Sequence, residues 1–173
     1  TDPAIETATD SIEAGRSGTI VAPVGIRPPL LAAVATRAAT PLVVLTATGR
    51  DAETLTNALA SWIPGVAMLP AWETLPHERL SPQVDTMARR IAVLRRLVHP
   101  IAGDDSAGPI SVLVVPIRAF LQPIISGLAD LEPVRVRTGD ILDLTDVTNR
   151  LAELGYERVD MVEGRGQMSV RGG

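Results

Sequence analysis

The segment from Ala22 to Pro29 lies where a nucleotide-binding protein would carry its phosphate loop, after a short apolar run and before a helical pattern. Such a loop needs inward-facing backbone N–H groups, a lysine for the β- and γ-phosphates and a Ser or Thr hydroxyl for Mg²⁺. Pro28 stands at the lysine position and Pro29 at the hydroxyl position, and each proline removes one N–H donor. Gly25 alone offers the backbone freedom of the turn, and Arg27 could still attract an anion. We predict an ordinary strand-to-helix turn without ATPase chemistry.

A second candidate site lies near the carboxyl end, where arginines are spaced along two short runs. Arg158 lies in the run 156–162, Arg171 in the run 167–171, and Arg165 in the turn between them. The planar guanidinium binds a carboxylate through two parallel hydrogen bonds, which lysine cannot do. These residues therefore indicate either a surface for an acidic partner or charges that only keep an exposed hairpin soluble.

The proline-rich segment 69–82, LPAWETLPHERLSP, offers a third group of reactive side chains. Trp72, His77 and Ser81 could form a binding or catalytic patch. However, the sequence shows no recognisable Ser/His/Asp catalytic triad, and His77 and His99 lack the spacing of metal ligands. A packed, proline-stiffened loop is the better interpretation, and no metal site is predicted.

The helix predicted over 83–98 follows this loop and carries charges on both sides. Asp85 and Arg89 are four residues apart and are expected to form an ion pair. Arg90 falls on the apolar side, so it must reach the surface or find a buried carboxylate or carbonyl. The remaining arginines are predicted to face solvent: Arg89, Arg95 and Arg96.

The elements that position these residues alternate between apolar runs and helical spacing. Residues 1–16 show a weak helical pattern. Strands are predicted at 19–22, 41–46, 66–69 and 110–115, with helices beginning near Pro28, Gly49 and Gln83. The run 110–115 is continuously apolar except for Ser111, as suits a sheet covered on both faces. Alternating strands and helices predict an α/β fold with a parallel sheet flanked by helices.

The pattern changes after about residue 128. Residues 132–137 alternate apolar and charged, which predicts a half-exposed antiparallel strand. Asp143 could cap a helix that Gly155 ends, and the runs 156–162 and 167–171 predict a hairpin. We expect an α/β domain over 1–128 and a small, incomplete α+β unit over 129–173.

Composition limits the possible classes of protein. The 173 residues are 46% hydrophobic, carry a net charge of −4 and include no cysteine, and all sixteen basic residues are arginine. Disulfides and thiolate metal sites are excluded, and no polybasic tract indicates that the chain binds nucleic acid. No signal peptide or 18-residue apolar stretch is present, so a cytoplasmic protein is expected. The final residues break off within a predicted strand, which suggests a fragment.

The sequence of residues 69–90 resembles the "WETLP…SP…D…R" segment of the bacterial transcription-repair coupling factor (Mfd) family. The resemblance runs from about residue 17 to the end and points to the amino-terminal, UvrB-like module. It implies a helicase-like domain 1 with a degenerate phosphate loop over 1–128. It also implies that the ATP and Mg²⁺ of the parent protein belong to a motor outside this chain, and that this fragment is not itself an enzyme.

The segment from 151 to 172 resembles the start of UvrB domain 2, which binds UvrA. Arg158 and Arg171 fall on contact arginines of that family, and Ser169 falls where UvrB has a third arginine. Arg165 is a neighbour on the turn. The resemblance implies a module that recruits UvrA in nucleotide excision repair. Its parent is implied to be an ATP-dependent translocase on double-stranded DNA that displaces stalled RNA polymerase and whose other domains keep the hairpin hidden.

Two other classes stay open from the residues themselves. An autonomous nucleotide- or phosphate-binding α/β enzyme would reveal itself by hydrolysing ATP or by being stabilised by it. A DNA-binding module with this acidic balance and few aromatic residues should bind weakly, with a shallow dependence on salt.

Overall fold

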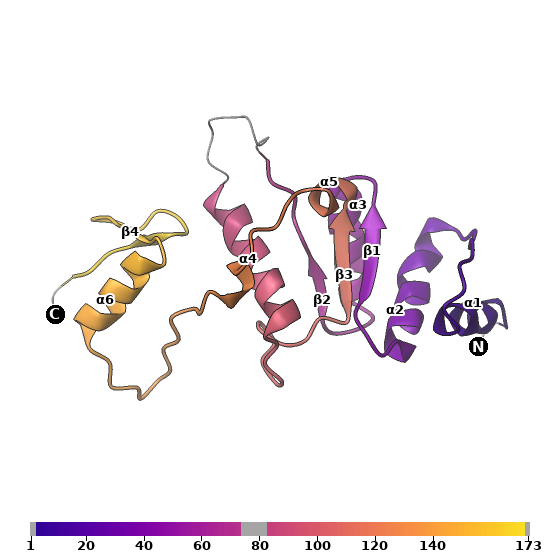
Figure 1. Cartoon of the computed structure of the whole chain (residues 1–173), viewed down its shortest axis with the longest axis horizontal. Coiled ribbons are helices and arrows are strands. Elements are labelled where there is room, and N and C mark those ends of the chain that lie inside the picture. The colour runs from indigo at the N-terminus through magenta and orange to yellow at the C-terminus, as the bar shows by residue number, and fades with distance from the viewer. Residues whose placement is uncertain (1–2, 74–82, 172–173) are drawn as a thin grey trace.

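The computed structural model describes residues 3–73 and 83–171, and it is a mixed α/β structure. Its three-stranded parallel sheet has the order β1–β3–β2, with β1 at Leu42–Thr46, β2 at Val66–Met68 and β3 at Val112–Pro116. In the register, Val44 of β1 and Met68 of β2 both lie opposite Val114 of β3. The predicted parallel sheet is confirmed, with its most apolar run as the central strand (Figure 1).

Helices cover both faces of β3. Val112 and Val114 pack with residues of α2 (Arg27–Arg37) and α3 (Gly49–Ala60), whereas Leu113 and Val115 pack with residues of α4 (Val84–Val98). Every residue of β3 is buried, because alternate side chains of a strand point to opposite faces and each face has its own core. The edge strand β1 is covered on one face only, so Val43 and Leu45 are 51% and 47% exposed.

Local chemistry explains where the helices begin. The Thr48 hydroxyl accepts a hydrogen bond from the Asp51 N–H and caps α3, and the Asp143 carboxylate accepts from the Thr145 and Asp146 N–H groups and caps α6 (Leu144–Glu153). Three shorter helical segments, η1, α5 and η2, span Val24–Ile26, Ile117–Phe120 and Leu128–Asp130. The amino-terminal helix α1 spans Pro3–Glu13, which confirms the weak helical pattern.

Gly65, just before β2, requires the absence of a side chain. Its φ is +74°, and a Cβ there would lie 2.8 Å from Ser111 Oγ and 2.9 Å from the Pro109 carbonyl oxygen. The Gly65 carbonyl accepts the Ser111 N–H at 2.8 Å, so this close approach joins β2 to the start of β3.

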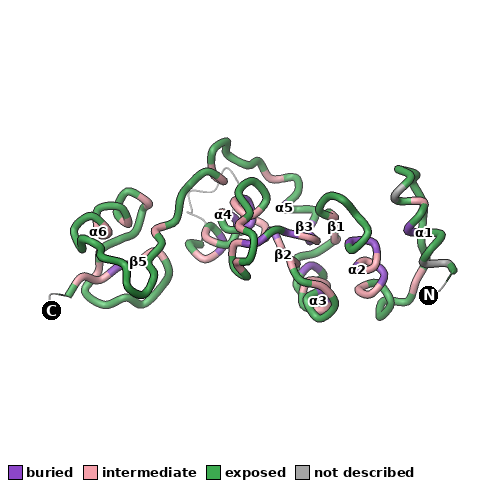
Figure 2. Tube along the Cα trace, turned by 90° about the horizontal axis from the view of Figure 1, so that it is seen from below, coloured by how far each residue is buried: buried purple, intermediate pink, exposed green. Residues whose placement is uncertain are grey.

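The carboxyl-terminal elements lie beyond α4, away from the sheet (Figure 1). They are α6 and two short strands, β4 at Glu157–Arg158 and β5 at Gln167–Met168. Figure 2 shows buried positions gathered at the sheet and its helices, whereas the carboxyl-terminal part is mostly exposed. Among the described residues from 129 onward, Met168 alone is buried. No helix of the described chain is long and apolar enough to cross a membrane.

Three strand predictions are wrong. Residues 19–22 form no strand, and Val21 is 96% exposed, because the run has no neighbouring strand to pair with in the described chain. Residues 132–137 are likewise irregular, and Pro133 lacks the N–H that a ladder would use. The two strands after Gly155 are not a hairpin, because β4 and β5 run parallel.

Candidate partner-binding surface

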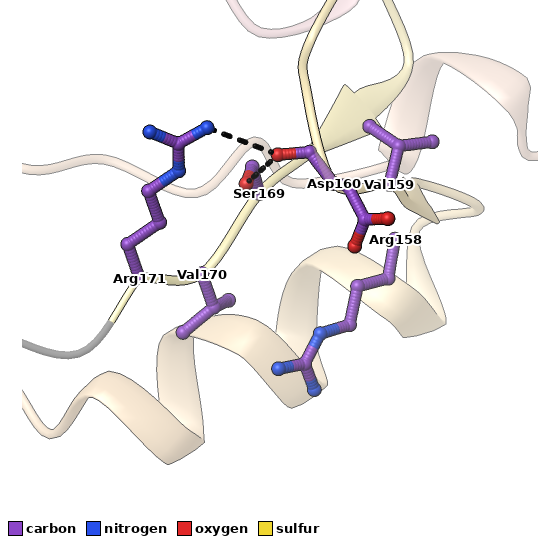
Figure 3. A pocket seen from close by; sticks show the side chains of 6 residues that line it. All are labelled: Arg158, Val159, Asp160, Ser169, Val170 and Arg171. Atoms are coloured by element: carbon purple, nitrogen blue, oxygen red, sulfur yellow. Dashed lines mark hydrogen bonds between the residues drawn. The ribbon is translucent and has the colours of Figure 1, made fainter.

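The short parallel pair β4–β5 brings the predicted carboxyl-terminal contact residues together. The Glu157 N–H donates to the Gly166 carbonyl at 2.8 Å, and the Val159 N–H donates to the Met168 carbonyl at 2.9 Å. Because the strands run in the same direction, the residues that follow β4 lie beside those that follow β5. They line a surface hollow formed by Arg158, Val159, Asp160, Ser169, Val170 and Arg171 (Figure 3).

The backbone carbonyl of Asp160 fixes one side of this hollow. It accepts a hydrogen bond from the Ser169 hydroxyl at 3.0 Å and a longer one from Arg171 Nη2 at 3.4 Å (Figure 3). Ser169 therefore has an internal structural role at the position where the UvrB resemblance places a third arginine. Arg158, Ser169 and Arg171 thus line one hollow, and their role in binding a partner stays a prediction.

Arg165 lies elsewhere. Its Nε is 2.9 Å from Asp85 Oδ1 on α4, and the other carboxylate oxygen of Asp85 is 2.7 Å from Arg89 Nε. Next to it, a Cβ added at Gly166 would lie 2.8 Å from Val84 Cγ1, so the turn between β4 and β5 sits against the start of α4. The predicted Asp85–Arg89 pair is confirmed, but Arg165 contacts α4 and does not line the hollow.

The amino-terminal candidate does not have the geometry of a phosphate loop. Within residues 3–23 no strand precedes it, and Gly25 lies within the right-handed turn η1 and does not adopt a positive φ. Arg27 begins α2, and Pro28 and Pro29 occupy its first turn, where a missing N–H has no helical partner to lose. The predicted helix start is confirmed, whereas the predicted strand-to-helix turn is wrong in its strand.

Arg90 is held inside the domain beside Trp72. Its Nη1 donates to the Pro70 carbonyl at 2.6 Å, and its guanidinium lies 4.4 Å from the centre of the Trp72 ring. Burial lowers the pKa of Arg90, because the charged form loses water. Gln122 fixes Trp72 by accepting its N–H at 2.7 Å and donating to its carbonyl at 3.2 Å. Of the outcomes predicted for Arg90, which were the surface, a buried carboxylate or a carbonyl, the structure shows the carbonyl. The packed role of Trp72 is confirmed, and His77 and Ser81 lie outside the described residues.

Glu73, the residue after Trp72, has a pKa below its ordinary value. Desolvation alone would raise this pKa, but the hydrogen bond from the Thr86 hydroxyl, backbone hydrogen bonds and the positive charge of Arg118 lower it. Arg118 also donates to the Glu73 carbonyl at 3.0 Å. These contacts join the end of the Trp72 segment to α4 and α5.

The prediction that Arg95 and Arg96 face solvent is wrong. Arg95 Nη1 donates to the Leu131 carbonyl at 3.0 Å and to the Ala129 carbonyl at 3.4 Å, and Arg96 Nε donates to the Gly108 carbonyl at 2.8 Å. Helical spacing shows which side of a helix is apolar, but it does not show which loops return to the polar side. Among the described residues, no group of three or more His, Asp or Glu residues could hold a metal ion.

Asp160 is the charged residue of the hollow that the sequence interpretation missed, together with Val159 and Val170. It lies two residues after Arg158, beyond the end of β4 at Arg158. No strand spacing announces its place, and only the structure shows that it lines the same hollow as Arg158.

Comparisons with known proteins address both parts of the chain. Residues 134–173 match the family described as the UvrB interaction domain. The transcription-repair-coupling factor of Mycobacterium tuberculosis is 48% identical over 158 residues, which cover 90% of this chain and 12% of that protein. For the Escherichia coli K12 factor the identity is 27% over 145 residues, covering 83% of this chain and 12% of that protein. The UvrABC system protein B of Vibrio vulnificus is 45% identical over 53 residues, covering 28% of this chain and 8% of that protein. The chain thus spans about 12% of the length of these coupling factors.

Proposed function

Since the chain is related over nine-tenths of its length to a segment of the transcription-repair-coupling factors, we propose that it acts in transcription-coupled repair by recruiting UvrA. The observation that carries this proposal is the hollow beside β4 and β5. It gathers Arg158, Ser169 and Arg171 on one exposed surface, within the residues that match the UvrB interaction domain.

The chemistry of this surface suits a protein partner. Arginine is enriched at the energetically dominant positions of interfaces, and its fixed fork binds a carboxylate with defined geometry. The segment from residue 129 carries six arginines and nine carboxylates, so bulk charge would not attract a polyanion. Recognition must therefore come from the local placement of Arg158 and Arg171, as in a protein interface.

The α/β domain is proposed to support this surface without chemistry of its own. The two prolines in the first turn of α2 leave no lysine or hydroxyl for a nucleotide phosphate. The translocase activity, its ATP and its contacts with RNA polymerase and DNA are proposed for other parts of the parent protein. Hydrolysis of ATP by this chain alone, or an ATP-dependent rise in its melting temperature, would contradict this division of roles.

Arginine truncation tests the proposal directly. Arg171→Ala and Arg158→Ala should each weaken UvrA binding by about 1–2 kcal/mol, because each removes a charged donor from the hollow. The matched control is Arg150→Ala on α6, where the arginine pairs with Glu153 at 3.0 Å and does not line the hollow. Affinities are measured by calorimetric titration of folded variants; unchanged affinity in both hollow variants would show that UvrA docks elsewhere.

A further inference from the structure

The hollow that gathers the arginines also contains an exposed carboxylate. Asp160 uses its backbone carbonyl to hold Ser169 and Arg171, while its side chain lies among the residues that line the hollow (Figure 3). No hydrogen bond or ion pair engages this carboxylate within the part of the chain that the structure describes. The side chain is thus available to a partner.

The Arg158 side chain is equally available to a partner. Among the described residues, several arginines already bind a carboxylate or a carbonyl: Arg37, Arg89, Arg90, Arg95, Arg96, Arg118, Arg150 and Arg165. In contrast, the Arg158 side chain has no hydrogen bond or ion pair among the described contacts, and Arg171 makes only its 3.4 Å bond. One hollow therefore presents opposite charges that do not neutralise each other.

The signs of these charges restrict what can dock. A uniformly acidic partner surface would satisfy Arg158 and Arg171 but would bring its own carboxylates against Asp160. Like charges placed together across an interface suppress binding. The acidic excess of the segment from residue 129 adds to this repulsion.

We propose that Asp160 determines the specificity of this surface, an inference that rests on the proposed recruitment of UvrA. The complementary region of UvrA carries a lysine or arginine beside its carboxylates. The basic side chain pairs with Asp160, while the carboxylates pair with Arg158 and Arg171. A mixed-sign pattern of this kind fixes the register of the complex and rejects surfaces that are only acidic.

The direction in which Asp160→Asn changes the affinity for UvrA tests the proposal. Asp160→Asn removes the charge at nearly constant size, and the backbone carbonyl that binds Ser169 and Arg171 remains. UvrA should bind the variant about tenfold more weakly, because its basic residue loses its partner. A uniformly acidic UvrA surface gives the opposite result, tighter binding, because the repulsion is removed. The matched control is Glu163→Gln, which removes an exposed carboxylate from the same turn outside the hollow and should leave affinity unchanged.

The companion variants separate the two proposals. Unchanged or tighter binding by Asp160→Asn, with Arg171→Ala still weakened, overturns the role of Asp160 and leaves UvrA recruitment standing. Unchanged binding by all three variants, Arg158→Ala included, overturns recruitment through this hollow. Asp160→Glu keeps the charge, so it should retain most of the affinity that Asp160→Asn loses; loss by both to the same extent would show that shape, and not charge, was disturbed.

Discussion

At the scale of single residues, Arg90 shows how a buried charge is accommodated. The residue is 1% exposed, bound to the Pro70 carbonyl and stacked on Trp72, and its Nε has no hydrogen-bond partner among the described residues. A cation over an aromatic face is worth up to about 2 kcal/mol when water is excluded. Arg90 thus connects α4 to the end of the segment that follows β2.

We expect Arg90→Ala to lower the free energy of unfolding by about 3 kcal/mol, because it opens a cavity and leaves the Pro70 carbonyl without this donor. Arg90→Met should cost less, since it retains much of the apolar stem. Urea unfolding followed by circular dichroism measures both. A loss below about 0.5 kcal/mol for the alanine variant would place Arg90 among ordinary surface residues.

At the scale of secondary-structure elements, α4 holds the carboxyl-terminal part at both of its ends. Near its last turn, Arg95 binds the Ala129 and Leu131 carbonyls and His99 lies 2.7 Å from Asp130. At its first turn, Asp85 binds Arg165. The stretch between these two attachments includes the irregular residues 131–143. The helix therefore sets where the hollow lies relative to the sheet.

The Asp85–Arg165 contact should limit the motion of the carboxyl-terminal part. Asp85→Asn and Arg165→Gln should both broaden the distance distribution between spin labels at Glu53 and Asn149, two exposed positions on α3 and α6. Arg89→Gln is the control, because it removes only the pair within α4. Equal distributions in all variants would show that the contacts at the end of α4 suffice.

The sequence predicted those elements that neighbouring residues specify, and it failed where an element depends on a partner distant in the chain. The capping of α6 by Asp143, the start of α2 at Pro28 and the continuous apolar run of β3 are local features, and all are confirmed. The wrong strands at 19–22 and 132–137 have β-type residues but no neighbour, and pairing is not visible in a single segment. The parallel direction of β4 and β5 depends on the path of the turn between them.

The candidate site stays a prediction, although the structure brings most of its residues together. The family resemblance supplied Arg158, Ser169 and Arg171, and the structure places all three in one hollow. Asp160 was not predicted, because it lies beyond the end of β4 and reaches the hollow only through the path of the chain. The attachment of Arg165 to Asp85 joins residues 80 positions apart, and no local pattern announces it.

At the scale of the whole molecule, burial is concentrated in the sheet and its helices. The boundary near residue 128 stays a prediction, but it agrees with a core on both faces of β3 and a single buried residue among those described from 129 onward. Few buried contacts mean that a segment opens at low free energy. The two parts of the chain should therefore differ in local stability.

Hydrogen exchange should reveal this difference. Amides of residues 131–136 should exchange nearly as fast as in an unfolded peptide, because no secondary structure protects them, whereas the Arg137 N–H donates to Asp140 Oδ2 at 2.8 Å. Amides of β3 should exchange only on global opening, and those of α6 at an intermediate rate. Mass spectrometry of exchanged peptides measures all three, and equal protection throughout would indicate one cooperative unit.

The sheet ends at β1, and this has a practical consequence for anyone handling the isolated polypeptide. An unpaired strand edge flanked by exposed Val43 and Leu45 is a template on which another molecule can extend the ladder. We therefore expect concentrated samples to aggregate through this edge and Val43→Lys to oppose it, because a charge on an edge strand discourages further pairing.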